Sequence, residues 1–273
     1  MIPPAPPSAS LNPSAAPPPR FARPDLPSFV AWVLFLGLIV SAFKGTGFSA
    51  EDFLAGLPGI ARIAGEMFPP SLERLDKVGL ALVETFHMAL IGTFAGVILS
   101  LPLAVLATRH LTPHAALYHA ARATIAFFRT VPDLIWALIF VIAVGLGPFA
   151  GTLAIMIDTI GFCGRFFAEA MEETDRAPQE ALGAIGAGRS SVIAAAVVPA
   201  ALPSMLATSL FALEKATRSS VVLGLVGAGG IGIELQVSME LFRYAEASTI
   251  ILAILVLVIA VEQAGAWLRR RTI

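Results

Sequence analysis

The feature that most constrains the fold of this 273-residue chain is a series of apolar stretches close to the length of a membrane span. A transmembrane helix needs about 20 predominantly apolar residues, because it must satisfy its own backbone hydrogen bonds within the hydrocarbon. Apolar residues make up 57% of the chain, charged residues 14%, and the mean hydropathy is +0.82, as in membrane proteins. We therefore predict an all-α, polytopic membrane protein with about six spans, at residues 29–43, 78–108, 130–150, 151–170, 204–226 and 248–268.

The start of the chain is rich in proline and has no apolar core. Such a segment cannot bury enough surface to offset the entropy of ordering it. We predict that residues 1–27 form a disordered, Pro-rich cytoplasmic tail. Residues 28–77 are then expected to hold the first membrane helix and a mixed-charge outer loop, and residues 78–271 the main transmembrane domain.

A polar stretch from Glu180 to Pro203 interrupts the apolar segments. Its glycines and prolines suit a short helix, a tight turn at residues 186–188, and a second helix that begins at Ser190 or Ser191 as N-cap. Such a helix pair can lie on a membrane surface and dock into a cleft of a partner.

This stretch resembles the EAA loop of the inner-membrane permease subunits of ABC importers, because Glu180, Ala181, Gly186 and Pro199 match its spacing. The departures replace one apolar residue by another, at Leu182, Ala196 and Val198. The resemblance implies that a coupling loop near residues 171–203 inserts into a groove of a separate ATPase subunit. There it would transmit the closing of that subunit to the membrane helices. An ordinary cytosolic loop is the alternative.

Ionisable side chains within a span are costly and therefore mark functional candidates. Glu214, Lys215 and Arg218 fall in the predicted fifth span, where Glu214 and Arg218 are one helical turn apart. Arg218 is placed to attract an anionic substrate in a central cavity, or else it pairs structurally with Glu214, and both interpretations stay open. Weaker candidates of the same kind are Glu84, His87, Asp133 and Asp158.

The fifth span ends in a glycine-rich run at residues 227–232, whose spacing fits the G-x-G-x-x-G dinucleotide-binding pattern. That pattern requires a parallel sheet around it, whereas both neighbours here have the length of membrane spans. We instead predict a gate, a backbone break or a re-entrant turn at Gly227, Gly229, Gly230 and Gly232.

Lys and Arg are expected to be more frequent on the cytoplasmic side of a membrane. With six spans and both termini inside, the inner segments hold most of the arginines, among them Arg109, Arg122, Arg176, Arg189 and the triplet 269–271. The outer segments hold Lys44, Arg62, Arg74, Lys77 and Arg243. This bias predicts that both termini and the 180–203 loop lie in the cytoplasm, and the resemblance implies that the membrane is the bacterial inner membrane.

Two further runs, at residues 128–148 and 218–232, are similar to those of permease subunits of phosphonate ABC importers, and the resemblance covers about residues 75–271. It implies a type I importer fold like that of methionine permeases, a homodimer in the lipid membrane, an ATPase partner and a substrate-binding protein. The implied cargo is a phosphonate or a related phosphite, phosphate or phosphate ester. The alternatives are a permease for another solute such as methionine, and, from another class, a secondary transporter or a membrane enzyme.

No motif of an ATPase, serine hydrolase or metalloprotease occurs in the sequence. We therefore expect no catalytic residue, no metal ligand and no cofactor in this chain, with ATP and Mg bound by the partner ATPase. The spacing of His110, His114 and His119 does not form a clean metal site. A net charge of −1 does not indicate a nucleic-acid partner.

Overall fold

The computed structural model describes residues 25–47 and 49–272, in two compact units that meet in the chain between Ile60 and Ala61. The prediction of an all-α membrane protein is confirmed, because the regular structure of these residues is entirely helical. Five of the described helices are long and apolar enough to cross a membrane, or six if one bent pair counts as a single span.

The first unit contains α1 (Leu26–Gly45) and most of α2 (Ala50–Glu66). Helix α1 is the expected first span, and Pro27 lies in its first turn, where the missing N–H costs nothing. The predicted tail therefore ends before Leu26, and its residues 1–24 lie outside the described part. Residues of the expected outer loop form α2, at whose start Ser49 Oγ accepts the Asp52 N–H at 3.0 Å.

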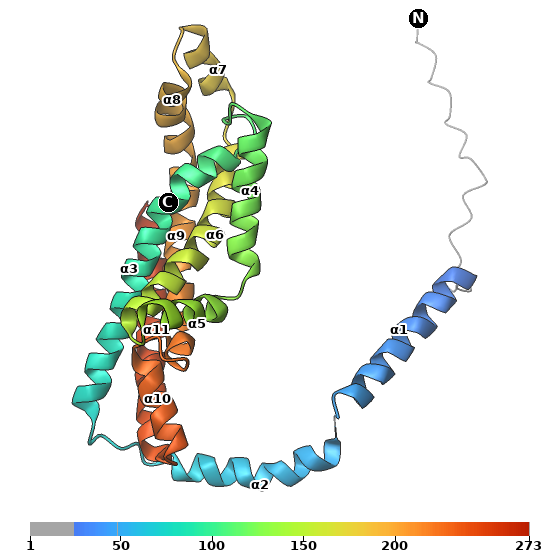
Figure 1. Cartoon of the computed structure of the whole chain (residues 1–273), viewed down its shortest axis with the longest axis vertical. Helices are drawn as coiled ribbons and strands as arrows, with labels where there is room; N and C mark the ends of the chain where they lie inside the picture. The colour runs from blue at the N-terminus through green and yellow to red at the C-terminus, as the bar shows by residue number, and fades with distance from the viewer. Residues whose placement is uncertain (1–24, 48, 273) are drawn as a thin grey trace, which may run out of the picture. The chain divides into compact units, whose positions relative to one another are not determined.

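The second unit is built on α3 (Leu75–Ala107), α6 (Pro148–Glu172) and α9 (Val198–Gly224), which pack on one another (Figure 1). Glycines allow α3 to approach α6 closely. A Cβ at Gly92 would lie 2.7 Å from Ile155, and one at Gly96 would lie 2.5 Å from Thr159. Small residues at the contact are how helices pack where the solvent is lipid.

The predicted third span differs from the structure, which has α4 (Ala115–Thr130) and α5 (Asp133–Val144) bent by 88°. Pro132 causes the break, since it disfavours a helical conformation for Val131, whose ψ is 120°. With 12 residues, α5 is about 18 Å long, too short to span alone. The span predicted at residues 130–150 is therefore the second part of a broken pair, and α4 packs against α6. A short connection follows, with α5 ending at Val144 and α6 beginning at Pro148.

The polar stretch forms α7 (Ala177–Ala184) and α8 (Arg189–Val192). The predicted serine N-cap was wrong, because Gly188 precedes the first helical residue and no side chain caps the helix. The second helix is also not separate from the fifth span: it continues through a π-helical turn at Ile193–Val197 into α9. Figure 1 shows α7 and α8 together at one end of this unit.

After the glycine-rich run, α10 (Ile231–Glu240) leads into the last span, α11 (Tyr244–Thr272). No helix was predicted between the glycine-rich run and the last span, whereas α10 forms there and packs on α9, α11 and α3. In Figure 1, α10 lies toward the end of the unit away from α7.

Candidate coupling segment and substrate path

The turn between α7 and α8 is shaped by Gly186. Its φ of +85° is in the left-handed region that favours glycine. The Gly186 N–H donates to Gly183 O and the Ala187 N–H to Leu182 O, both at 3.0 Å, which satisfies carbonyls at the end of α7. The predicted coupling residues Glu180 and Ala181 lie in α7, and beside the turn Ile185 is 81% exposed. An exposed apolar residue on a projecting turn suits contact with a partner.

Pro199, the last predicted coupling residue, lies in the first turn of α9, directly after the π-helical turn. Proline has no N–H to donate to the preceding turn, and such positions are where helices bend or change their hydrogen-bond pattern. The structure thus joins α8 to α9 as one continuous element, Arg189–Gly224, which begins directly after the α7–α8 turn. A displacement at α8 would reach the residues of α9 without crossing a loop.

An ion pair joins α9 to α6 inside the span. Lys215 Nζ lies 2.9 Å and 2.8 Å from the two carboxylate oxygens of Asp158, and 5.2 Å from the ring centre of Phe162. Asp158 was a weak candidate from the sequence, and its partner was not predicted. Glu214, one residue earlier on α9, contacts Arg218 and Arg269 instead. Helix α9 therefore takes part in two separate groups of ion pairs.

Glu214 lies between two arginines. Arg218 Nη1 is 3.5 Å from Glu214 Oε1, and Arg269 Nη2 of α11 is 3.9 Å from Glu214 Oε2. The Glu214 side chain is 11% exposed, that of Arg218 48%. The predicted pair of Glu214 and Arg218 is therefore present, but it leaves about half of the Arg218 side chain uncovered. The contact from Arg269 was not predicted, because the two residues lie far apart in the chain.

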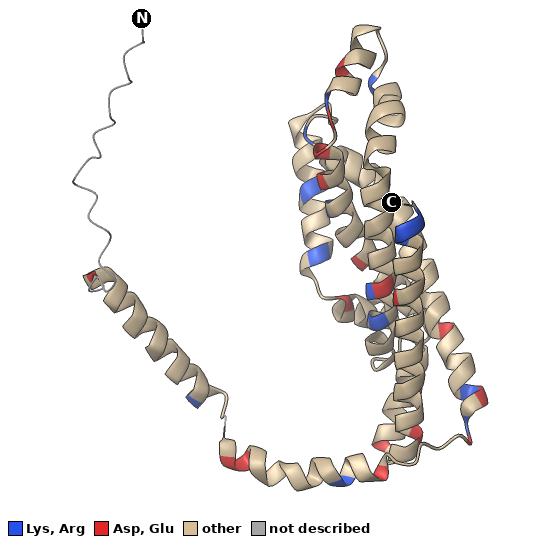
Figure 2. Ribbon diagram, turned by 180° about the vertical axis from the view of Figure 1, so that it is seen from behind, with Lys and Arg blue, Asp and Glu red and all other residues tan. Residues whose placement is uncertain are grey.

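These charges lie together within the spans, and Figure 2 shows basic and acidic residues meeting in the middle of the second unit. An exposed charge facing hydrocarbon costs several kcal/mol. The open side of Arg218 therefore has to face water or protein. Lys215, Arg218 and Arg269 outnumber Asp158 and Glu214 by one positive charge, which attracts anions.

The glycine-rich run is a tight backbone turn. Gly227, Gly229 and Gly230 have φ values of +83°, +89° and +78°. A Cβ at Gly232 would meet the carbonyl oxygen of Val221 and lie 2.8 Å from Gly224 Cα, so the start of α10 packs directly on the backbone of α9. The predicted break residues are thus brought together where α9 ends.

Two side chains of α3 cap the first turn of α10. The Gly230 N–H donates to Glu84 Oε1 at 2.8 Å, and the Ile231 N–H donates to Thr85 Oγ1 at 2.7 Å. These bonds satisfy donors that a helix start otherwise leaves open. Glu84 was a weak candidate and Thr85 was missed, although two adjacent polar residues in an apolar stretch were a visible signal.

At the α10 end, Arg74 Nη2 lies 3.0 Å from Glu234 and its Nη1 lies 3.2 Å from Glu246. The hydrogen bond with Glu246 and the charge of Glu234 raise the pKa of Arg74 above its usual value. This link between the start of α3, α10 and α11 was not predicted. Among residues 25–47 and 49–272, no three His, Cys, Asp or Glu side chains are grouped as metal ligands.

Comparison with known proteins gives matches that all belong to membrane transport systems. The family described as "Binding-protein-dependent transport system inner membrane component" matches residues 92–273. The phosphite transport system permease protein PtxC of Stutzerimonas stutzeri is 40% identical over 221 residues, which are 81% of this chain and 80% of that protein. The phosphate-import permease protein PhnE of Mycolicibacterium smegmatis is also 40% identical, over 85% of this chain but 43% of its own length, so the chain spans less than half of that relative.

Among solved structures, a chain of an inward-facing MetNI methionine ABC transporter has a TM-score of 0.66 and 24% sequence identity. The match covers 74% of this chain and 99% of that one. At this identity the similarity shows the fold alone.

Proposed function

Because the chain belongs to the family of inner-membrane components of binding-protein-dependent transport systems, we propose that it is the permease subunit of an ABC importer for phosphonate, phosphite or phosphate. The observation that carries the substrate class is the 40% identity to a phosphite permease over 81% of this chain. The similarity to the methionine transporter, at 24% identity, supports the fold and gives methionine no comparable support.

In this proposal α7 and α8 form the coupling element. Exposed Ile185 and the residues Glu180 and Ala181 dock into a groove of a separate ATPase, which binds ATP and Mg. Closing of the ATPase moves α8, and the continuous helix Arg189–Gly224 carries the movement into the span. The chain itself then needs no catalytic residue, and it contributes the path rather than the hydrolysis.

The substrate path runs along the charged face of α9. Arg218, whose side chain is 48% exposed, would hold the oxyanion, with Lys215 one turn away. A second copy of the chain would cover this face and enclose a water-filled cavity, since lipid would not solvate these charges. Lipid surrounds the remaining apolar surface, and no nucleic acid takes part.

The orientation follows from the arginines. Arg109, Arg122 and Arg176 lie toward the α7 end of the second unit, and Lys and Arg favour the cytoplasmic side. In this proposal the α7 end lies in the cytoplasm with the ATPase and both termini. The α10 end then faces the substrate-binding protein. The turn at Gly227, Gly229 and Gly230 would serve as the outer gate, because it joins the path helix to α10.

Substrate-dependent uptake tests this assignment. The complete complex, with its ATPase and binding protein, is reconstituted in proteoliposomes and supplied with ATP and with methylphosphonate, phosphite, phosphate or methionine. Uptake of one or more phosphorus oxyanions, without uptake of methionine, is expected. Uptake of methionine alone would retain the ABC permease and exclude the proposed substrate class.

A further inference from the structure

A second cationic site lies outside the proposed path, at the α7 end of the unit. Arg109, His110, Tyr118, Arg122, Glu172 and Arg176 line a cavity of about 610 Å³. Three arginines and one glutamate are among the lining residues, so the cavity carries a surplus of positive charge. Helices α4 and α6, the α3–α4 connection and the residue before α7 all contribute to it.

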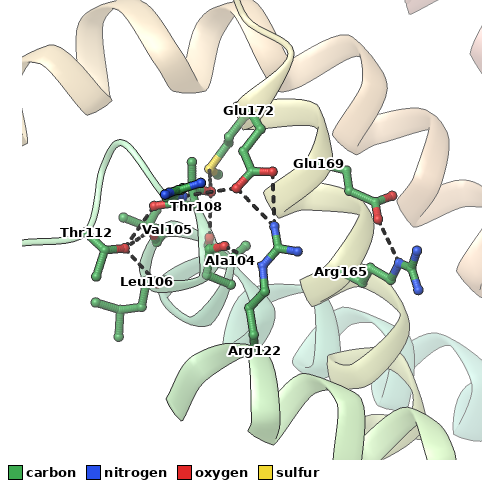
Figure 3. A network of polar contacts seen from close by, with 12 residues as sticks. Ala104, Val105, Leu106, Thr108, Thr112, Arg122, Arg165, Glu169 and Glu172 are labelled. Atoms are coloured by element: carbon green, nitrogen blue, oxygen red, sulfur yellow. Dashed lines mark hydrogen bonds and ion pairs between the residues drawn. The ribbon is translucent and has the colours of Figure 1, made fainter. Parts of the chain in front are cut away.

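Arg122 is held in a fixed orientation. Its Nε donates to Ala107 O at 3.1 Å, its Nη2 donates to both oxygens of Glu172 at 3.0 Å, and its guanidinium lies over Tyr118 at 5.1 Å. Figure 3 shows the side chain of Arg122 pointing toward Glu172. A guanidinium fixed in this way loses little further freedom when it binds an anion.

The other two arginines are free to take a ligand. Arg109 uses its backbone N–H to bind Glu172, at 3.0 Å, and within the described part of the chain neither its guanidinium nor that of Arg176 makes an ion pair. His110 adds a buried Nε2 that has no hydrogen-bond partner among the described residues. Unsatisfied buried polar atoms are uncommon and call for a partner.

We propose that this cavity is an oxyanion site that binds a phosphate or phosphonate group through Arg109, Arg122 and Arg176. Arginines from three segments line this one cavity, and guanidinium donors match the several acceptor oxygens of a tetrahedral oxyanion. The group comes either from a free anion or from the headgroup of an anionic phospholipid, which offers the same chemistry.

The position of the site gives it a regulatory role. Glu172 is the last residue of α6, and α7 begins at Ala177. Through Arg122 and the Arg109 N–H, Glu172 ties α4 and the α3–α4 connection to the base of the coupling element. An oxyanion bound beside Glu172 would change the charge around this tie. The site is separate from the path at Arg218, so anion binding here does not depend on the proposed transport route, whereas the regulatory role rests on the proposed coupling function of α7 and α8.

Phosphate binding to the full-length chain tests the proposal. The probe is inorganic phosphate, titrated calorimetrically at constant ionic strength against the chain in nanodiscs of neutral phosphatidylcholine. The double variant Arg109→Gln/Arg176→Gln removes no ion pair and is expected to bind about tenfold more weakly, equivalent to about 1.4 kcal/mol. The matched control, Arg270→Gln/Arg271→Gln, removes the same charge from α11, outside the cavity, and should bind like the wild type.

A second arm identifies the source of the group. Phosphatidylglycerol retained by each protein is counted by native mass spectrometry after purification from mixed nanodiscs. Loss of phosphate binding in Arg109→Gln/Arg176→Gln would show that the site binds a free anion. Loss of phosphatidylglycerol in that variant, but not in the control, would show that the site binds a lipid headgroup. Equal behaviour of both double variants in both arms would overturn the proposal. If the double variant aggregates, Arg176→Gln alone takes its place, because Arg176 is exposed and forms no side-chain cap.

Discussion

Lys215 of α9 holds Asp158 of α6 through both carboxylate oxygens, at 2.9 Å and 2.8 Å, within the apolar part of the chain. Because a lone charge in this environment is costly, Asp158→Asn should destabilise the protein by about 1–3 kcal/mol, less than for a fully buried pair. The measurement is the Tm of the purified protein in detergent.

Glu169→Gln on the same helix is the matched control. It breaks the Arg165–Glu169 pair, whose side chains are 49% and 38% exposed, and should change stability by less than about 0.5 kcal/mol. A double change, Asp158→Leu with Lys215→Met, should regain much of the loss. An equal Tm for Asp158→Asn and Glu169→Gln would mean that the α6–α9 pair does not stabilise the fold.

The contact of Gly232 with the backbone of α9 predicts a strong effect of one methyl group. Gly232→Ala should lower stability by about 1–3 kcal/mol, because its Cβ would meet the Val221 carbonyl oxygen. Gly79→Ala, in α3, has no atom within 4 Å of its Cβ and should be neutral or stabilising by up to about 1 kcal/mol. Thermal unfolding of both variants decides this, and a more stable Gly232→Ala protein would contradict the close packing.

Arg218→Ala should lower uptake of a phosphorus oxyanion about tenfold or more while the complex with the ATPase still forms. The reason is that about half of the Arg218 side chain is exposed, which an arginine that only pairs with Glu214 would not require. Uptake and co-purification of the ATPase are measured on the same preparation. Arg270→Ala, exposed on α11, serves as the control. Unchanged uptake in Arg218→Ala would leave Arg218 with only its ion-pair role.

Stability should fall on acidification because of His110. Burial, helped by the charge of Arg176, lowers the pKa of His110 below its ordinary value of 6.5. The unfolded chain therefore binds this proton more readily. The contribution of His110 is complete above about pH 6.5 and is lost as the pH falls through the lower folded pKa. The Tm of His110→Gln should decline less between pH 7 and pH 5 than that of the wild type. The control, exposed His114→Gln, should follow the wild type. Identical dependence of Tm on pH in all three proteins would show that His110 is not the cause of the loss of stability.

Much of the fold could be predicted from the length and spacing of the apolar stretches, since a lipid-spanning chain has few alternatives to helices. Breaks within helices were harder to predict. Pro132 divides a span, whereas Pro58, Pro102 and Pro203 lie inside helices, and only packing around each proline decides between these outcomes. Helices α2 and α10 were missed because they are short or carry charges.

Contacts between candidate residues on one helix were easier to predict than contacts between residues on different helices. The spacing of Glu214 and Arg218 predicted their contact, because residues four apart share a helix face. Contacts of Lys215 with Asp158, of Glu214 with Arg269 and of Gly230 with Glu84 join segments far apart in the chain. These depend on how the helices pack, which hydropathy does not encode.

The central claim is that this chain uses α7 and α8 to turn ATP hydrolysis by a partner into import of a phosphorus oxyanion. It is tested most directly by uptake of radiolabelled phosphite into proteoliposomes that contain the complete complex, with wild-type chain or with Glu180→Lys. The account predicts ATP-dependent uptake by the wild type and at most about one tenth of it in the variant, with the variant still inserted in the membrane. Wild-type uptake rates in Glu180→Lys, or wild-type uptake that does not depend on ATP, would contradict it.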